Sequence, residues 1–192
     1  MKFPDVCFLP GLLCVLSAAA VAQNVPAAAP VDNAFIQRVF SITCTLLPGV
    51  PPIVADFDGD GTDDIAIPAK CTNPMMDQAE NRFKVVDPYN EFFGYGDPKI
   101  TNGFASEDPE FRGRSLLIFH GAGSEAWRSA TPKAKFVIIN LPFKQLRARK
   151  MMVKKKAVTA IYAEEASADE MTSSVFWDGR KYKYQPLGSN LE

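Results

Sequence analysis

The clearest chemistry in this chain lies in a nine-residue stretch, Asp56-Phe57-Asp58-Gly59-Asp60-Gly61-Thr62-Asp63-Asp64. Acidic side chains fall at positions 1, 3, 5 and 9 of this stretch, and a glycine falls at position 6. A hard cation such as Ca²⁺ takes about six to eight oxygen ligands, which a short loop supplies by curling around the ion. The glycine permits the sharp turn that such a loop needs. We therefore expect a Ca²⁺ site with these ligand residues: Asp56, Asp58, Asp60, Thr62 through its backbone carbonyl, and Asp64.

The residues on either side of the loop indicate which kind of calcium site this is. Pro52–Ala55 and Asp64–Ile67 are short apolar, β-branched runs that predict two strands. An EF-hand loop instead joins two helices and ends with a bidentate glutamate at position 12, where this chain has Ile67. The sequence therefore favours a strand–loop–strand site over an EF-hand.

The loop resembles a known calcium motif. Residues 54–66, Val-Ala-Asp-Phe-Asp-Gly-Asp-Gly-Thr-Asp-Asp-Ile-Ala, are similar to the calcium loop of the FG-GAP/VCBS repeat family. Those repeats form blades of β-propellers, as in integrin α-subunits and many exported bacterial proteins. The resemblance implies the same five ligand residues, and it leaves Asp63 at a solvated position that matches no ligand. Residues 116–123, Leu-Leu-Ile-Phe-His-Gly-Ala-Gly, look like the next strand and turn of such a blade.

The chain departs from that family in its repeat number. We find one Asp-rich loop and no second copy, whereas a propeller needs about four to eight blades that bury one another. We expect a mainly β (α+β) fold, with an antiparallel sheet related to propeller-blade repeats and a short N-terminal helix, and no complete propeller. Residues 32–192 are expected to form a single calcium-binding β-rich domain.

The N-terminal residues predict export. Residues 1–22 have the pattern of a signal peptide, with Lys2, an apolar run over 6–20 and the small-residue cleavage site Ala20-Val21-Ala22. Residues 23–31 are rich in proline and alanine and predict a flexible leader. The apolar run is too short for a good membrane span, so we expect no stable membrane insertion after cleavage. The protein is therefore expected to be secreted or periplasmic.

Two cysteines, Cys44 and Cys71, lie outside the predicted signal peptide and flank the Asp-rich loop. An oxidising compartment favours their pairing. We expect a disulfide between them, and the alternative is two buried free thiols.

Patterns elsewhere predict one helix and several strands. Near-helical apolar spacing predicts a helix over Asp32–Cys44. The expected strands are Ser115–Phe119, Lys135–Leu141, Ala157–Ala163, Ser173–Trp177 and Arg180–Gln185. Asp178-Gly179 between the last two predicts a type I′ hairpin turn with positive φ at both residues. The proline-rich stretch 72–111 is expected to be a long loop that holds either binding function or local structure.

Charge excludes some partners. A formal net charge of −1 gives no global electrostatic case for binding nucleic acid or an anionic membrane. Lysine and arginine nevertheless concentrate in residues 144–156. We expect this basic stretch to be a solvated helix or loop before a strand. The alternative is that it binds a polyanion or a phosphate-bearing surface. A further hypothesis is a periplasmic inhibitor or assembly factor that uses this stretch.

No complete catalytic motif is present in the sequence, which favours a non-enzymatic role. The alternative is a small exported hydrolase with a site near His120, with Ser115 or Ser124 nearby, and the 72–111 loop. Glu164-Glu165 and Asp169-Glu170 could serve as acid/base pairs, but we expect a solvated loop there.

The expected partner of a non-enzymatic domain is another exported protein or a surface glycan. An aromatic binding surface around Phe92-Phe93-Gly94-Tyr95-Gly96, with Tyr89, Trp127 and Trp177, is the best candidate for this contact. Ordinary core and loop packing is the favoured alternative for these aromatic residues.

Overall fold

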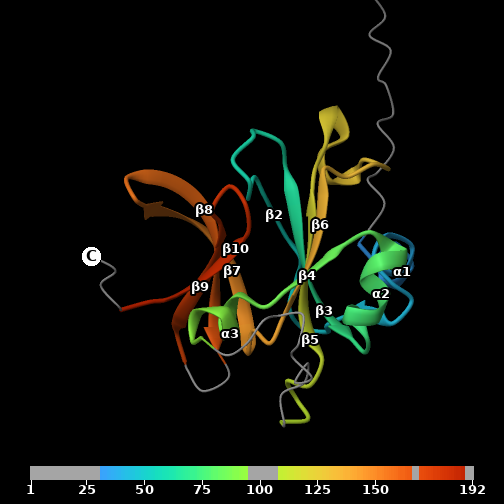
Figure 1. Cartoon of the computed structure of the whole chain (residues 1–192), viewed down its shortest axis with the longest axis horizontal. Coiled ribbons are helices and arrows are strands. Elements are labelled where there is room, and N and C mark those ends of the chain that lie inside the picture. The colour runs from blue at the N-terminus through green and yellow to red at the C-terminus, as the bar shows by residue number, and fades with distance from the viewer. Residues whose placement is uncertain (1–30, 95–107, 166–168, 189–192) are drawn as a thin grey trace, which may run out of the picture.

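The computed structural model describes residues 31–94, 108–165 and 169–188, and its structure there is mainly β (Figure 1). Most of the predicted leader, the predicted signal peptide and Tyr95 lie outside these residues. In chain order the elements are α1 (Asn33–Val39), β1 (Cys44–Leu46), β2 (Ile53–Ala55), β3 (Asp64–Cys71), α2 (Pro74–Asn81), β4 (Lys84–Val86), α3 (Pro88–Phe92), β5 (Arg114–His120), the 3-10 helix η1 (Gly123–Arg128), β6 (Ala134–Ile139), β7 (Phe143–Val153), β8 (Lys156–Glu165), β9 (Met171–Trp177) and β10 (Tyr182–Pro186).

The strands form two sheets. The first sheet has the order β1-β3-β5-β6-β4, and β2 also pairs with β3. Its pairs are antiparallel except for β4 and β6, which run parallel. The second sheet has the order β10-β9-β8-β7 and is antiparallel throughout. Figure 1 shows the first sheet in the middle, with α1 and α2 on one side of it and the second sheet on the other.

The first sheet is buried on both faces, and because side chains of a strand alternate between its two sides, neighbouring residues enter different cores. On β5, Leu116 and Ile118 belong to the core shared with the second sheet. Leu117 and Phe119 belong to a separate core that includes residues of α1. This double burial explains the continuous apolar runs that predicted strands β5 and β6. It also fixes the register of β3, β5 and β6, because a slip of one residue would exchange the two cores.

The predicted N-terminal helix exists but is shorter than expected. It begins after Asp32, whose side chain accepts the N–H of Phe35 at 2.7 Å, and it ends at Val39 rather than at Cys44. Cys44 lies in β1, opposite Cys71 of β3. The prediction was wrong beyond Phe40, because sheet pairing outweighs helical spacing there. Ile42, which the helical pattern placed with the apolar face, is 81% exposed.

Local structure occupies much of the stretch predicted as a loop over 72–111. It contains α2, β4 and α3, and both helices begin with a proline. Proline suits the first turn of a helix because its missing N–H would have no partner there. Two of the prolines that indicated a loop, Pro74 and Pro88, are therefore helix starts.

The basic stretch 144–156 is a β-hairpin, so the expected solvated helix or loop was wrong. Val153 of β7 pairs with Lys156 of β8 across a two-residue turn, in which Lys154 and Lys155 have φ of 47° and 68°. Leu146 and Ala148 of β7 face the core and alternate with the exposed Arg147 and Arg149. The charges hid a period-two pattern, because only one face of this strand is buried.

Two further expectations about the second sheet need correction. The strands around Asp178-Gly179 exist, but the connection spans 178–181 and only Gly179 has a positive φ, so it is not a type I′ turn. The Asp178 carboxylate instead accepts the backbone N–H groups of Arg180 and Lys181. Residues 164–165, expected in a solvated loop, are the last residues of β8.

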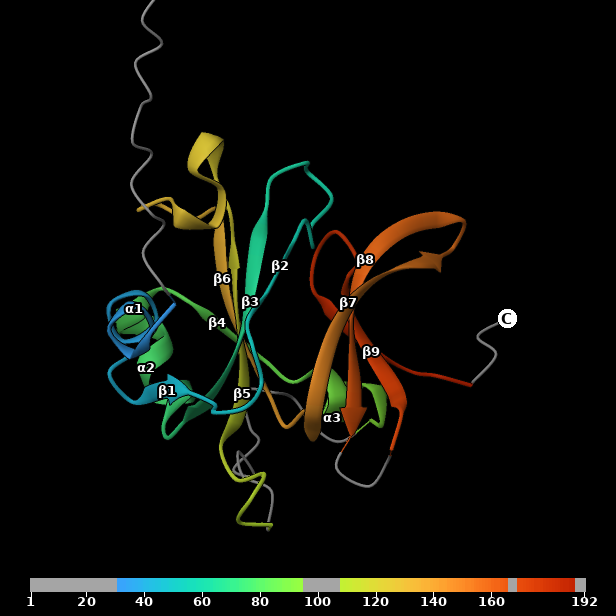
Figure 2. The ribbon, with the colours of Figure 1, turned by 180° about the vertical axis from the view of Figure 1, so that it is seen from behind.

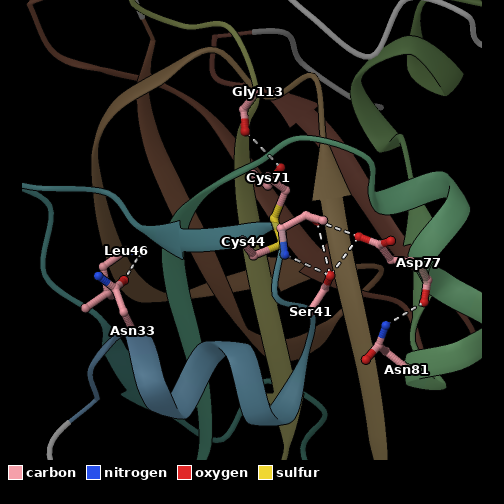
Figure 3. The surroundings of a disulfide bond; sticks show 10 residues. Asn33, Ser41, Cys44, Leu46, Cys71, Asp77, Asn81 and Gly113 are labelled. Carbon is pink, nitrogen blue, oxygen red and sulfur yellow. Dashed lines mark hydrogen bonds between the residues drawn. A yellow bond between two sulfur atoms is a disulfide. The ribbon is translucent and has the colours of Figure 1, made fainter.

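The predicted disulfide is confirmed. Cys44 and Cys71 are bonded and join β1 to β3 (Figure 3). Beside this bond, the Ser41 and Thr43 hydroxyls donate to the Asp77 carboxylate at 2.7 and 2.5 Å, which ties α2 to the start of β1. Among the helices of the described residues, none has the length and apolar character needed to cross a bilayer.

Replacing both cysteines, Cys44→Ala with Cys71→Ala, should lower the free energy of unfolding by about 3–4 kcal/mol in the chain-entropy model. The two residues are 27 positions apart, and the bond restricts the unfolded chain over that length. Urea unfolding of the oxidised protein and of the double variant measures the difference. Reductant should destabilise the unmodified protein and leave the double variant unchanged; a loss below about 1 kcal/mol contradicts a stabilising bond.

Candidate metal centre

The Asp-rich loop connects two strands, as the sequence predicts. Ala55 at the end of β2 pairs with Asp64 at the start of β3, so residues 56–63 close an antiparallel hairpin. Gly59 and Gly61 have φ of 80° and 87°, conformations that other residues rarely adopt. Gly61, the glycine that the sequence predicts at the sharp turn, therefore allows that turn.

Asp56 organises the inside of the loop. Its Oδ1 accepts the N–H groups of Gly59 and Asp60 at 2.7 and 3.1 Å, and its Oδ2 accepts the N–H of Gly61 at 3.0 Å. The backbone therefore curls around this one carboxylate. Asp60 continues the curl by accepting the Thr62 N–H at 2.7 Å.

Asp64 joins the loop to the neighbouring strand. Its carboxylate is fully buried, and its Oδ2 accepts the N–H groups of Phe57 and Asp58 at 2.8 and 3.2 Å. Its Oδ1 accepts the N–H of Gly121, which follows β5, at 2.8 Å. Burial raises the pKa of Asp64 to about 6, although the three N–H donors favour its ionised form.

Gly121 is required by the close approach of two segments. A Cβ atom at this position would lie 2.3 Å from the Asp63 carbonyl oxygen and 2.8 Å from the Trp127 nitrogen. The absence of a side chain therefore lets the loop, the end of β5 and η1 come together. The glycines after His120 predicted a turn, and this contact adds a packing reason for one of them.

Three of the predicted ligands converge. Asp56, Asp58 and Asp64 each offer a carboxylate oxygen, and these oxygens lie within 4.8 Å of one another. An all-oxygen donor set suits hard cations such as Ca²⁺ or Mg²⁺. Asp60 lies on the exposed side of the loop and is not in this group, and Asp63 is exposed, as expected.

Lys133, which no sequence pattern singled out, supplies a positive charge to the loop. Its ammonium nitrogen lies 2.6 Å from Asp58 Oδ2 and 2.8 Å from Asp60 Oδ2. The hydrogen bond from Lys133 lowers the pKa of Asp60 to about 2, and the two carboxylates raise the pKa of Lys133. The backbone N–H of Lys133 donates to the His120 carbonyl, which places this residue beside the end of β5.

His120 lies buried behind the loop, at 2% exposure. Its Nε2 is 2.7 Å from the Tyr182 hydroxyl, and its Nδ1 is 3.4 Å from Asp58 Oδ2. Burial lowers the pKa of His120, which favours a neutral ring. A neutral imidazole satisfies both contacts when Nδ1–H faces Asp58 and the Tyr182 hydroxyl donates to Nε2.

The geometry gives His120 no nucleophile within the described residues. Its polar side-chain contacts there are with Tyr182 and Asp58. Ser115 lies near the other end of β5 and donates to the Gly113 carbonyl, and Ser124 is exposed on η1. This arrangement favours a positioning role for His120 behind Asp58.

The predicted aromatic surface is divided between several places. Trp127 is buried against Phe35 of α1. Trp177 is half-buried and contacts the His120 ring, with the ring centroids 5.2 Å apart. Phe92 and Phe93 remain exposed and pack on Tyr184.

Comparison of the chain with protein-family models, with curated proteins and with solved structures finds no match. The resemblance to FG-GAP/VCBS repeats therefore stays a prediction from the loop sequence, and the candidate site is described from its geometry alone.

Asp64→Ala should reduce the free energy of unfolding by at least about 3 kcal/mol, because it leaves three backbone N–H groups without their acceptor. Asp63→Ala is the matched control, since its side chain is exposed on the same loop, and it should change stability by less than about 0.5 kcal/mol. Denaturant unfolding in chelator measures the effect without a metal. Equal effects of the two variants would contradict this role of Asp64.

Proposed function

We propose that this protein is an exported calcium-binding domain with a structural or interaction role, in which residues 56–64 hold one Ca²⁺. The observation that carries the proposal is the convergence of Asp56, Asp58 and Asp64 within 4.8 Å. Carboxylates this close repel one another, and Lys133 contacts only Asp58 of the three, so a bound cation would relieve the remaining repulsion.

The strand arrangement supports the relation to propeller blades. β2, β3, β5 and β6 are successive antiparallel neighbours in the first sheet, and β7 to β10 form a second such series. A propeller blade is also a four-stranded sheet. The predicted signal peptide and the disulfide support export, because disulfides persist in oxidising compartments.

The proposed ligands are those that the sequence indicates. The carboxylates of Asp56, Asp58, Asp60 and Asp64 and the carbonyl of Thr62 would supply the oxygens, with Asp64 also anchoring the loop to Gly121. Only the folded chain positions these groups together, so a bound ion would stabilise the folded state by mass action. The gain is about 2.7 kcal/mol when free ion is about 100 times Kd.

Calorimetric titration with calcium should show one saturable site, and thermal unfolding should give a higher Tm in calcium than in chelator. Asp58→Ala and Asp60→Ala should each abolish or severely weaken binding, because each removes a carboxylate ligand. Asp63→Ala, whose side chain is exposed on the same loop, should bind as the unmodified protein does. Unchanged affinity in both ligand variants would overturn the assignment.

Lys133→Met should raise calcium affinity about fivefold, because the ammonium group competes with the ion for Asp58 and Asp60. The expected gain in affinity is small because the Lys133 side chain is half exposed and solvent screens its ion pairs. Lys84→Met, an exposed lysine on β4, controls for the loss of one charge. Weaker calcium binding in Lys133→Met would show that the lysine supports the site instead.

A further inference from the structure

A groove lies between the β7–β8 hairpin and the β9–β10 hairpin. Its volume is about 820 Å³, and Asp58 and Gly59 of the calcium loop line part of it. β7 pairs with β8 as far as Val153 and Lys156, whereas the pairing of β9 with β8 begins at Ala160. Figure 2 shows the β7–β8 hairpin projecting beyond the rest of its sheet. The overhanging hairpin is therefore one wall of the groove.

Four lysines line this groove: Lys150, Lys154, Lys156 and Lys183. Lys154 and Lys156, at the hairpin turn, have no acidic partner in the described part of the chain. Lys150 donates to the neutral Thr159 hydroxyl at 2.7 Å. Lys183 shares Glu91 with Lys181. Most of the positive charge in the groove is therefore available to an external anion.

The two carboxylates that line the groove, Asp58 and Asp178, offset part of this charge, but the four lysines outnumber them. Asp58 is in contact with Lys133, outside the groove lining. Asp178 accepts the backbone N–H groups of Arg180 and Lys181, which close the hairpin turn. Only Asp58 is paired with a lysine outside the lining, and the groove keeps an excess of positive charge, which favours an anionic ligand.

The groove also presents aromatic rings. Trp177 is half-buried in its lining, and it is fixed from behind by His120, Phe136 and Tyr182, whose ring centroids lie 5.1–5.2 Å from its own. Phe92 is 42% exposed and lines the same groove. Rigid aromatic faces beside polar groups suit a ligand with apolar faces and polar edges, and a sugar ring is such a ligand.

We propose that this groove binds an acidic polysaccharide. The lysines pair with carboxylate or sulfate groups of the polymer, and Trp177 and Phe92 contact its sugar rings. The chain has a net charge of −1, so the groove attracts acidic groups at short range only, and its aromatic rings favour a polymer of sugars. The proposal names the partner for the interaction role proposed above, and it does not depend on the loop's binding calcium.

The test is calorimetric titration of the protein with two probes, an oligogalacturonate and a heparin-derived oligosaccharide, which carry carboxylate and sulfate groups. At least one should bind with an affinity that falls as salt rises. A neutral cello-oligosaccharide and poly-glutamate of matched length are the controls, and both should bind much more weakly. Absence of binding by both acidic probes, or equal binding of poly-glutamate, would overturn the proposal.

Variants locate the contact. Lys154→Gln with Lys156→Gln should weaken saccharide binding about tenfold, because two exposed lysines can no longer pair with acidic groups of the saccharide. Lys70→Gln with Lys84→Gln removes the same charge from exposed positions outside the groove lining and should have little effect. Phe92→Ala tests the aromatic contact at an exposed residue, so it should preserve the fold and weaken binding. Equal loss in both lysine pairs would show non-specific attraction and overturn the groove assignment.

Each titration is made in calcium and again in chelator. If the protein binds the saccharide but gives no heat of binding on titration with calcium, the result supports the groove and rejects the calcium site. Calcium binding without saccharide binding would reject the groove alone.

Discussion

The buried carboxylate of Asp64 holds together the parts of this molecule from which a site can be built. It accepts N–H groups from the loop, at Phe57 and Asp58, and from Gly121 after β5. A buried charge is costly unless hydrogen bonds compensate it, so these three bonds fix the loop against the sheet. The shape of residues 56–64 is therefore a property of the tertiary fold as well as of its glycines.

The register of the first sheet brings the other charged groups to the same place. Ile65 pairs with Phe119 and His120 pairs with Ala134, so Asp64, His120 and Lys133 lie at one end of three adjacent strands. Burial on both faces maintains this register, because a one-residue shift would move every side chain into the opposite core. Core packing thus determines which groups surround Asp58.

Charges on the molecule are separated into two neighbouring regions. Lys133 partly compensates the acidic loop, while the lysines of the β7–β8 hairpin face a groove whose two carboxylates are outnumbered by its lysines. His120 and Trp177 lie between the two regions, in ring contact. A hard cation in the loop would neutralise the acidic region, and an acidic polymer in the groove would neutralise the basic region. Such binding would be consistent with the proposed interaction domain.

The sequence by itself determined the features that depend on neighbouring residues: the strand–loop–strand around residues 56–64, the alternating strands and the cysteine pair. It could not determine contacts between distant residues, such as that of Lys133 with Asp58, 75 positions away. The end of α1 and the basic hairpin were also decided by the tertiary structure, because sheet pairing and one-sided burial override local spacing and charge. Local geometry follows from residue type, whereas the site and groove require the register of two packed sheets.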